Sequence, residues 1–163
     1  MRVLGIDPGS TVTGYAVVDA GPGNGDASSR GLGRLIECGV ITCTRANPLP
    51  QRLAELHEGI VELIARHHPT ALALENAFYH KNVRTTLVLG HARGVVLLAA
   101  QQAGLAIAEY PPATIKKTVV GRGGARKAQV GAMVARLLRL AHAPTPADAA
   151  DGVAVALTHI LRT

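Results

Sequence analysis

The chain has 163 residues, of which 48% are hydrophobic and 17% charged, so it can fold into one domain of ordinary size, spanning residues 1–163. No run of 18 apolar residues occurs and the start, MRVLGID, lacks the apolar core of a signal peptide, which excludes a membrane-spanning helix and favours the cytoplasm. The net charge of +6 is concentrated in residues 81–139, where ten lysines and arginines and one acid give +9. This segment favours a polyanion such as nucleic acid as partner, the alternative being a solvated, arginine-rich surface.

Three strand-like segments open the chain. Residues 2–7 and 14–18 flank the turn sequence Asp7-Pro8-Gly9-Ser10, and residues 33–42 follow a glycine-rich connection. Because no helical spacing of apolar residues separates these segments, they predict an antiparallel β-meander.

Helices and strands alternate after Pro50. Apolar residues recur at helical spacing from Pro50 to Pro69, and a short apolar strand follows at 71–75. The pattern then predicts a helix at 84–103 closed by Gly104, a strand at 105–109, helices near 113–119 and 125–141, and a last helix from about 146 to 161. Without any internal repeat or domain boundary, this order predicts an α/β fold, a mixed five-stranded sheet flanked by helices.

The helix at 84–103 contains two glycines, Gly90 and Gly94, four residues apart. Glycine lowers helix propensity, so close packing is expected to compensate. Two partners fit equally well: the sheet of the same chain, or a second helix in a dimer.

Four acids stand at positions where elements begin or end. Asp7 and Glu75 end two strands, and Asp148 and Asp151 open the last helix three residues apart, on one face. Converging carboxylates repel one another unless cations neutralise them, and hard oxygen ligands suit Mg²⁺ or Mn²⁺. Two such ions roughly 3.5–4 Å apart form a centre that cleaves phosphodiesters.

Each of these acids also has an ordinary structural explanation. Asp7 suits an Asp-Pro-Gly turn, and Glu75 a solvated strand end. Asp148 fits a capping box with Thr145 as N-cap, and Asp151 suits the positive end of a helix dipole. Their joint placement beside the basic segment is what favours a catalytic site.

Five sequence blocks in the same order resemble the RuvC family of Holliday junction resolvases. They are GIDPGSTVTGY at 5–15, ENAFYHKN at 75–82, LGHARG at 89–94, KTVVG at 117–121 and ADAADGVAVA at 147–156. Thr158 and His159 fit as well, so the resemblance covers nearly the whole chain, from residue 3 to 159.

The resemblance implies an RNase H-like fold and two Mg²⁺ or Mn²⁺ ions per active site, bound by Asp7, Glu75, Asp148 and Asp151. Some members of the family have histidine at the position of Asp148, so this site is expected to contain carboxylates alone. The family further implies a homodimer that makes paired, symmetric nicks in four-way junction DNA and cooperates with the RuvA–RuvB branch-migration complex. Phe78 matches an aromatic residue that stacks on bases, with a buried core position as the alternative.

Basic side chains are expected along the path of the DNA, where they would contact phosphates. Lys116 and Lys127 match lysines that the family places near the DNA backbone. Together with other basic residues of the positive segment, they make up the expected set: Arg84, Lys116, Lys117, Arg122, Arg126 and Lys127.

Three other functions remain open on the residues alone. An ATP-binding protein of the actin and sugar-kinase class also begins with a strand, an Asp and a glycine turn, but needs two lobes. A DNA-binding module without catalysis would not need the four acids. A nuclease of the same fold that acts on RNA or RNA–DNA hybrids is separated from a junction resolvase only by the resemblance.

Overall fold

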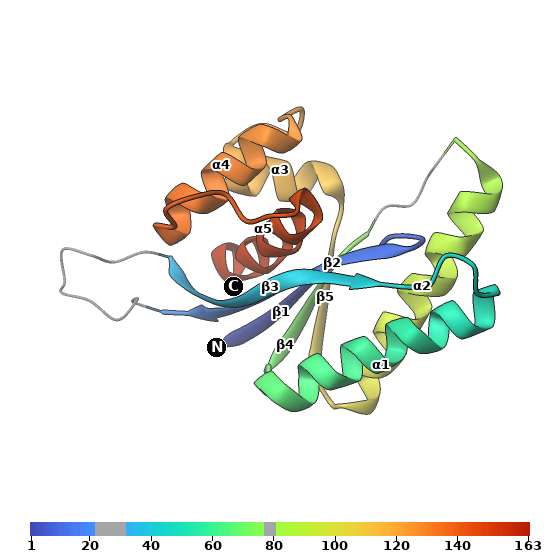
Figure 1. The fold of residues 1–163 in the computed structure, drawn as a ribbon. Helices are drawn as coiled ribbons and strands as arrows, with labels where there is room; N and C mark the ends of the chain where they lie inside the picture. Colours follow the sequence, from blue (N-terminus) through green and yellow to red (C-terminus); the bar gives the residue numbers. More distant parts are fainter. Residues whose placement is uncertain (22–31, 77–80) are drawn as a thin grey trace.

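The computed structural model describes residues 1–21, 32–76 and 81–163 (Figure 1). In chain order its elements are β1 (Arg2–Asp7), β2 (Val12–Ala20), β3 (Gly33–Thr42), α1 (Leu49–His67), β4 (Ala71–Glu75), α2 (Val83–Gln102), β5 (Ala106–Tyr110), α3 (Pro112–Val120), α4 (Lys127–Leu138) and α5 (Ala147–Arg162). Every predicted element is present, with ends that differ by a few residues. For example, α4 ends at Leu138 because Arg139 adopts a left-handed φ of 54°.

The five strands form one mixed sheet in the order β3-β2-β1-β4-β5, which confirms the predicted sheet. Neighbours β3, β2 and β1 are antiparallel, whereas β4 pairs in parallel with both β1 and β5. Strands β1, β3, β4 and β5 therefore run in the same direction, and their carboxyl ends lie at one edge of the sheet.

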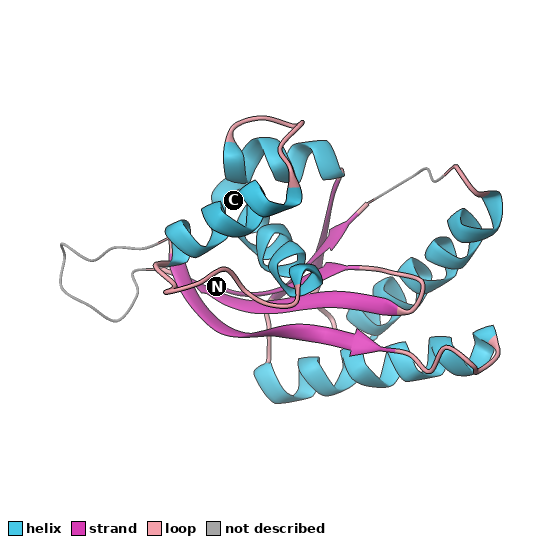
Figure 2. Cartoon of the chain, turned by 45° about the horizontal axis from the view of Figure 1, so that its top comes forward, coloured by secondary structure: helices cyan, strands magenta, loops and turns pink. Residues whose placement is uncertain are grey.

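Alternate residues of the central strands face two separate cores. Val3 of β1 and Ala73 of β4 pack beneath α3, α4 and α5, whereas Leu4 and Leu74 pack beneath α1 and α2. Figure 2 shows α1 and α2 on one side of the sheet and the other helices on the opposite side. The sheet is thus covered on both faces, as the alternation of strands and helices predicts.

Helix α5 approaches the sheet at glycines. A Cβ at Gly5 would lie 2.4 Å from the carbonyl oxygen of Gly152, and a Cβ at Gly14 would lie 1.9 Å from that of Asp148. Side chains at these positions would push the helix away. The glycines therefore fix the height of the first turn of α5 above β1 and β2.

Helix α2 buries only one of its faces. Ala92, Val96 and Ala99 pack into the core, but Leu87 is 61% exposed and Leu98 53% exposed. Among the described residues it is the one helix long and apolar enough, by length and composition alone, to span a membrane, although the sequence analysis predicted none. Its buried face packs against the sheet and α1, so α2 is part of the folded core.

The two glycines of α2 have no close neighbour in the described part of the chain. A Cβ at Gly90 or Gly94 would meet nothing within 4 Å. The alternative that the sheet packs tightly against these glycines is therefore wrong, since both lie on the exposed face.

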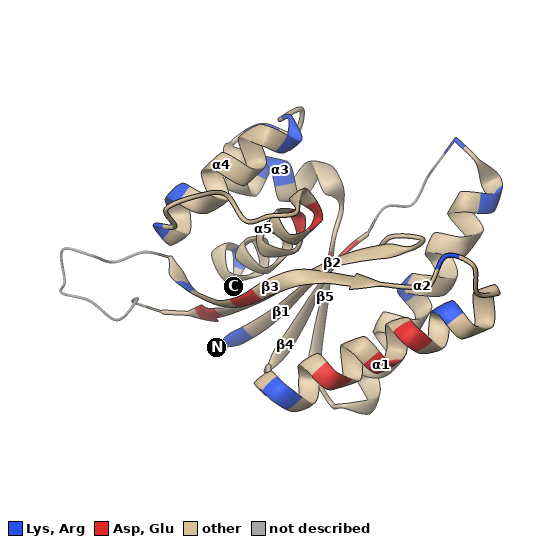
Figure 3. Cartoon of the chain, viewed as in Figure 1, with Lys and Arg blue, Asp and Glu red and all other residues tan. Residues whose placement is uncertain are grey.

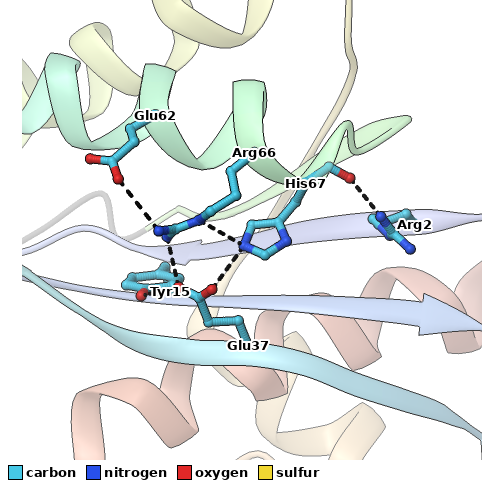
Figure 4. A network of polar contacts seen from close by, with 6 residues as sticks. All are labelled: Arg2, Tyr15, Glu37, Glu62, Arg66 and His67. Atoms are coloured by element: carbon cyan, nitrogen blue, oxygen red, sulfur yellow. Dashed lines mark hydrogen bonds and ion pairs between the residues drawn. The ribbon is translucent and has the colours of Figure 1, made fainter.

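A polar network joins the last turn of α1 to the sheet (Figure 4). Tyr15 donates a hydrogen bond of 2.7 Å to Glu37 of β3, and Arg66 donates one of 2.8 Å to the same oxygen. His67 lies 2.9 Å from the other Glu37 oxygen, and its carbonyl accepts a 2.7 Å hydrogen bond from Arg2. These hydrogen bonds from Tyr15 and His67 lower the pKa of Glu37. The network fixes α1 at the end of the sheet away from Asp7.

Candidate active site

Strand pairing places Asp7 and Glu75 side by side. Ile6 of β1 pairs with Leu74 of β4 in parallel register, so the next residue of each strand lies at the same sheet edge. Both acids follow residues that face α1 and α2, so both point to the face that carries α5. Two cavities meet at these acids, one toward α2 and one toward α3, α4 and α5, and Asp7 and Glu75 line both.

The first turns of α5 bring two more acids to this edge. One carboxylate oxygen each from Asp7, Asp148 and Asp151 lie within 4.8 Å of one another. Glu75 lies outside that group of three but lines a cavity together with Asp7 and Asp151. The structure thus brings all four predicted acids to one place, three of them in close contact.

The helix cap that offered Asp148 another role is absent. The N-cap of α5 is Pro146, without a side-chain hydrogen bond, so the capping box predicted from Thr145 is wrong. The alternative explanation of Asp148 therefore fails, and its side chain points instead toward the other acids.

Burial and the charges of neighbouring acids make Asp7 and Glu75 hard to ionise. Burial, together with the charges of Glu75 and Asp151, raises the pKa of Asp7 to about 8. Burial and Asp151 likewise raise the pKa of Glu75. Such a cluster needs protons or cations to be stable at neutral pH.

Lys127 supplies part of that positive charge. Its Nζ lies 2.7 Å from Asp151 and 3.9 Å from Asp148, and the hydrogen bond to Asp151 raises the pKa of the lysine. Lys116 lines the same cavity from α3. Both were expected to contact DNA, and the structure places them at the carboxylates.

The remaining basic residues predicted to contact DNA lie on both sides of the acids (Figure 3). Lys117 belongs to α3, Arg122 follows that helix, and Arg126 is the N-cap of α4. Arg84 lies in the first turn of α2. Phe78 lies outside the described residues.

Arg93, which was not predicted from the sequence, lines a cavity with Asp7 and Glu75. Its guanidinium forms an ion pair with Glu109 of β5, through a 2.9 Å hydrogen bond from Nε. No local pattern could have revealed it, because the helix and the strand meet only in the folded chain.

The donor set fits a divalent cation of the Mg²⁺ type. All the close donors are carboxylate oxygens, and among the described residues no histidine or cysteine belongs to the group. Hard oxygen donors of this kind suit Mg²⁺ and Mn²⁺ better than Zn²⁺.

The sequence profile of the family described as crossover junction endodeoxyribonuclease RuvC matches residues 3–159. The chain belongs to the RuvC family. The RuvC of Halorhodospira halophila is 49% identical over 97% of this chain and 89% of its own length, and that of Azorhizobium caulinodans is 46% identical over 98% and 89%.

Solved RuvC structures share the fold. Thermus thermophilus RuvC is 35% identical, covers 99% of this chain and 94% of its own, and superposes with a TM-score of 0.85. The same protein in complex with Holliday junction substrate gives 0.87, with the same identity and coverage. The predicted RNase H-like fold is therefore confirmed. As a RuvC protein the chain is a Holliday junction-resolving endonuclease, and the family implies the use of divalent metal.

Proposed function

We propose that residues 1–163 form one nuclease domain that binds four-way DNA junctions and nicks two strands symmetrically, with Asp7, Glu75, Asp148 and Asp151 as metal ligands. The observation that carries this proposal is the convergence of three of these carboxylates within 4.8 Å, beside Glu75 and two lysines. The cleaved strand would lie over this edge of the sheet, in recombination and DNA repair.

The acids prepare the site to hold two Mg²⁺ or Mn²⁺ ions. When bound, such a pair activates water and stabilises the leaving oxygen, with no covalent enzyme intermediate. The fold supplies the geometry, since β1, β4 and α5 hold the carboxylates before any substrate arrives. Lys127 keeps the acids together and can turn toward a phosphate, because its side chain is 67% exposed.

The exposed stripe of α2 supports a homodimer. Val83, Leu87 and Leu98 are among the most exposed large apolar side chains described, and Gly90 and Gly94 lie between them on the same face. The stripe follows helical spacing, and small residues at its centre allow two helices to approach closely. Two copies joined here would present two active sites to one junction.

The proposal also includes partners and location. A RuvC protein is expected to act with the RuvA–RuvB branch-migration complex, which delivers junctions whose core can move. The site of action would be the cytoplasm. Phe78 would stack on a base at the opened junction, a contact worth about 1–3 kcal/mol.

Cleavage of a four-way junction with a mobile core tests the proposal. Wild type and Asp7→Asn would be compared with EDTA, Mg²⁺ or Mn²⁺ on the junction, on linear duplex and on an RNA–DNA hybrid. We expect paired nicks with 5′-phosphates only in the junction and only with metal. Asp7→Asn should abolish cleavage yet bind the junction almost as well, because the basic surface remains.

Other outcomes separate the alternatives. Cleavage of the hybrid would retain the metal centre but overturn the substrate. Tight junction binding without cleavage, on a range of core sequences, would favour a binding module. Phe78→Ala should lower cleavage more than general DNA affinity, and unchanged cleavage with a destabilised fold would place Phe78 in the core.

A further inference from the structure

Three arginines surround a shallow cavity outside the group of carboxylates. Arg45 lies between β3 and α1, Arg52 in α1, and Arg84 in the first turn of α2. Ser10 and Thr11 complete the wall, with Thr85 and Val88. The cavity has a volume of about 370 Å³. We call it the arginine cavity.

No acid lines the arginine cavity, and no ion pair joins its three arginines to a described acid. The acid nearest in sequence to Arg52, Glu55, is already engaged. It accepts hydrogen bonds of 2.6 Å from the backbone of Thr44 and from the side chain of Asn47. Glu55 therefore holds the loop that carries Arg45 in place. Its charge acts on Arg52 from a distance, without an ion pair, and it does not line the cavity.

Arg52 is held in the wall of the cavity by two hydrogen bonds. Its Nη2 donates to the carbonyl oxygen of Ser10, and its own carbonyl oxygen accepts from the thiol of Cys43 at 3.3 Å. Its Nε is buried and has no hydrogen-bond partner among the described residues. A buried donor without a partner is costly, unless a ligand or water occupies the space beside it.

Like charges gathered in one cavity repel one another unless an anion compensates them. Guanidinium groups bind phosphate oxygens with paired, charge-assisted hydrogen bonds, and the hydroxyls of Ser10, Thr11 and Thr85 are further donors. We infer that the arginine cavity binds one phosphodiester group of a DNA strand, apart from the phosphate that is cleaved.

The position of the cavity suits this role. The turn after β1 supplies Asp7 and Pro8 to one cavity at the carboxylates and Ser10 and Thr11 to the arginine cavity. Helix α2 likewise supplies Thr86 to the first and Thr85 to the second. The two cavities are therefore neighbours. The arginine cavity lies on the α2 side, whereas the lysines at the carboxylates come from α3 and α4.

DNA bound over the carboxylates would thus contact the lysines on one side and the arginine cavity on the other. This inference rests on the proposed function. The same donors could bind free inorganic phosphate, so the test must distinguish the two sources. A duplex phosphate contact releases counterions, and its loss lowers the slope of log affinity against log salt by about 0.9. Free phosphate binding would leave that slope unchanged.

The variants Arg45→Gln and Arg84→Gln remove exposed side chains and should fold normally. Arg34→Gln is the matched control, because Arg34 lies at the opposite end of the sheet, where it pairs with Asp19 at 3.7 Å. Binding of the wild type and of each variant to a four-way junction would be measured in EDTA from 50 to 300 mM salt. Thermal unfolding with and without inorganic phosphate forms the second arm.

Each single variant should weaken junction binding at 0.1 M salt and lower the salt slope by less than 1, because the remaining arginines still face the phosphate. The double variant should lower the slope by about 1 in total, because both arginines hold the same phosphate. Arg34→Gln should match the wild type.

Three results would overturn the inference. The first is a slope for Arg45→Gln equal to that of Arg34→Gln. The second is a double variant whose slope falls by about 2, since that would mean two independent contacts. The third is phosphate protection of the wild type without any change of slope in the variants. Loss of cleavage by Asp7→Asn is measured separately, so failure of the catalytic proposal would not be confused with these results.

Discussion

Asp7 is the residue whose ionisation the fold opposes most clearly. Burial and the neighbouring charges of Glu75 and Asp151 raise its pKa from an ordinary value of 3.8 to about 8. A carboxyl with a raised pKa holds its proton longer in the folded chain than in the unfolded one. Its ionisation therefore costs folding stability as pH rises from about 4 to 8.

Asp7→Asn should therefore stabilise the metal-free protein at pH 8. We expect a gain of about 1–2 kcal/mol, or roughly 2–8 °C in melting temperature, and a smaller gain at pH 5. Thermal unfolding in EDTA at the two pH values measures it. Asp19→Asn is the control of opposite sign, because its hydrogen bond from Arg2 lowers the pKa of Asp19. Equal shifts at both pH values would contradict the prediction for Asp7.

Lys127 competes with a cation for the same carboxylates. Its Nζ lies 2.7 Å from Asp151, so an ion that binds there must displace the ammonium. Lys127→Met should make the metal-free protein less stable at pH 8 and increase the stabilisation by Mg²⁺ or Mn²⁺. Melting temperatures with EDTA and with saturating metal measure both effects. Lys117→Met removes a charge from the preceding helix, α3, and should change neither quantity. An unaltered metal effect in Lys127→Met would argue against competition.

At the scale of elements, glycines in the sheet allow α5 to pack closely against it. Gly14→Ala would place a Cβ 1.9 Å from the carbonyl oxygen of Asp148. Backbone cannot yield as a side chain does, so α5 must shift, at a cost of about 1–3 kcal/mol. Because the shift displaces Asp148, cleavage should fall more than junction binding. Gly124→Ala is the control, since a Cβ there meets nothing within 4 Å; wild-type activity in Gly14→Ala would show that the helix position is not critical.

The sequence predicted the elements well because most carry a local signal. The apolar spacing of α1 and the glycine after α2 fixed those helices, and Gly104 does adopt a positive φ of 70°. The predicted strand begins at Gly14, whereas β2 begins at Val12, which pairs with Thr42 of β3. Ends set by pairing with a distant strand cannot be recognised from local residues.

Some residues of the site could likewise be predicted from local sequence, and others could not. The acids were predictable because strand ends and helix starts are recognisable, and the parallel pairing of β1 with β4 then brings Asp7 to Glu75. The contact of Lys127 with Asp151 joins two helices and carries no local pattern. Arg45 and Arg52 could not be predicted for another reason. Both lie in residues 1–80, which have a net charge of −2, so the charge of this segment does not indicate a basic cavity.

At the scale of the whole molecule, the exposed face of α2 decides how many active sites meet one junction. Gly90 and Gly94 are costly in a helix, and a Cβ at either would meet nothing within 4 Å, although Gly90 also lines the cavity beside Asp7 and Glu75. Replacing both with alanine should stabilise an isolated chain by roughly 1–2 kcal/mol through helix propensity. If the glycines allow two helices to approach, the same change should weaken the dimer. Unfolding would then show a more stable chain, whereas light scattering would show a smaller fraction of dimer.

Leu87→Asp tests what the dimer does. Leu87 is 61% exposed, so the variant should fold, but a carboxylate at the centre of an apolar contact would separate the two copies. A monomer retains its carboxylates and arginines, so metal binding and single nicks should persist. The two nicks in one junction should become independent, and nicked junctions should accumulate before resolved products. Leu161→Asp, at a leucine 38% exposed near the end of α5, is the control that should still cut in pairs. Paired nicks by a Leu87→Asp protein that light scattering shows to be monomeric would mean that α2 does not couple the active sites.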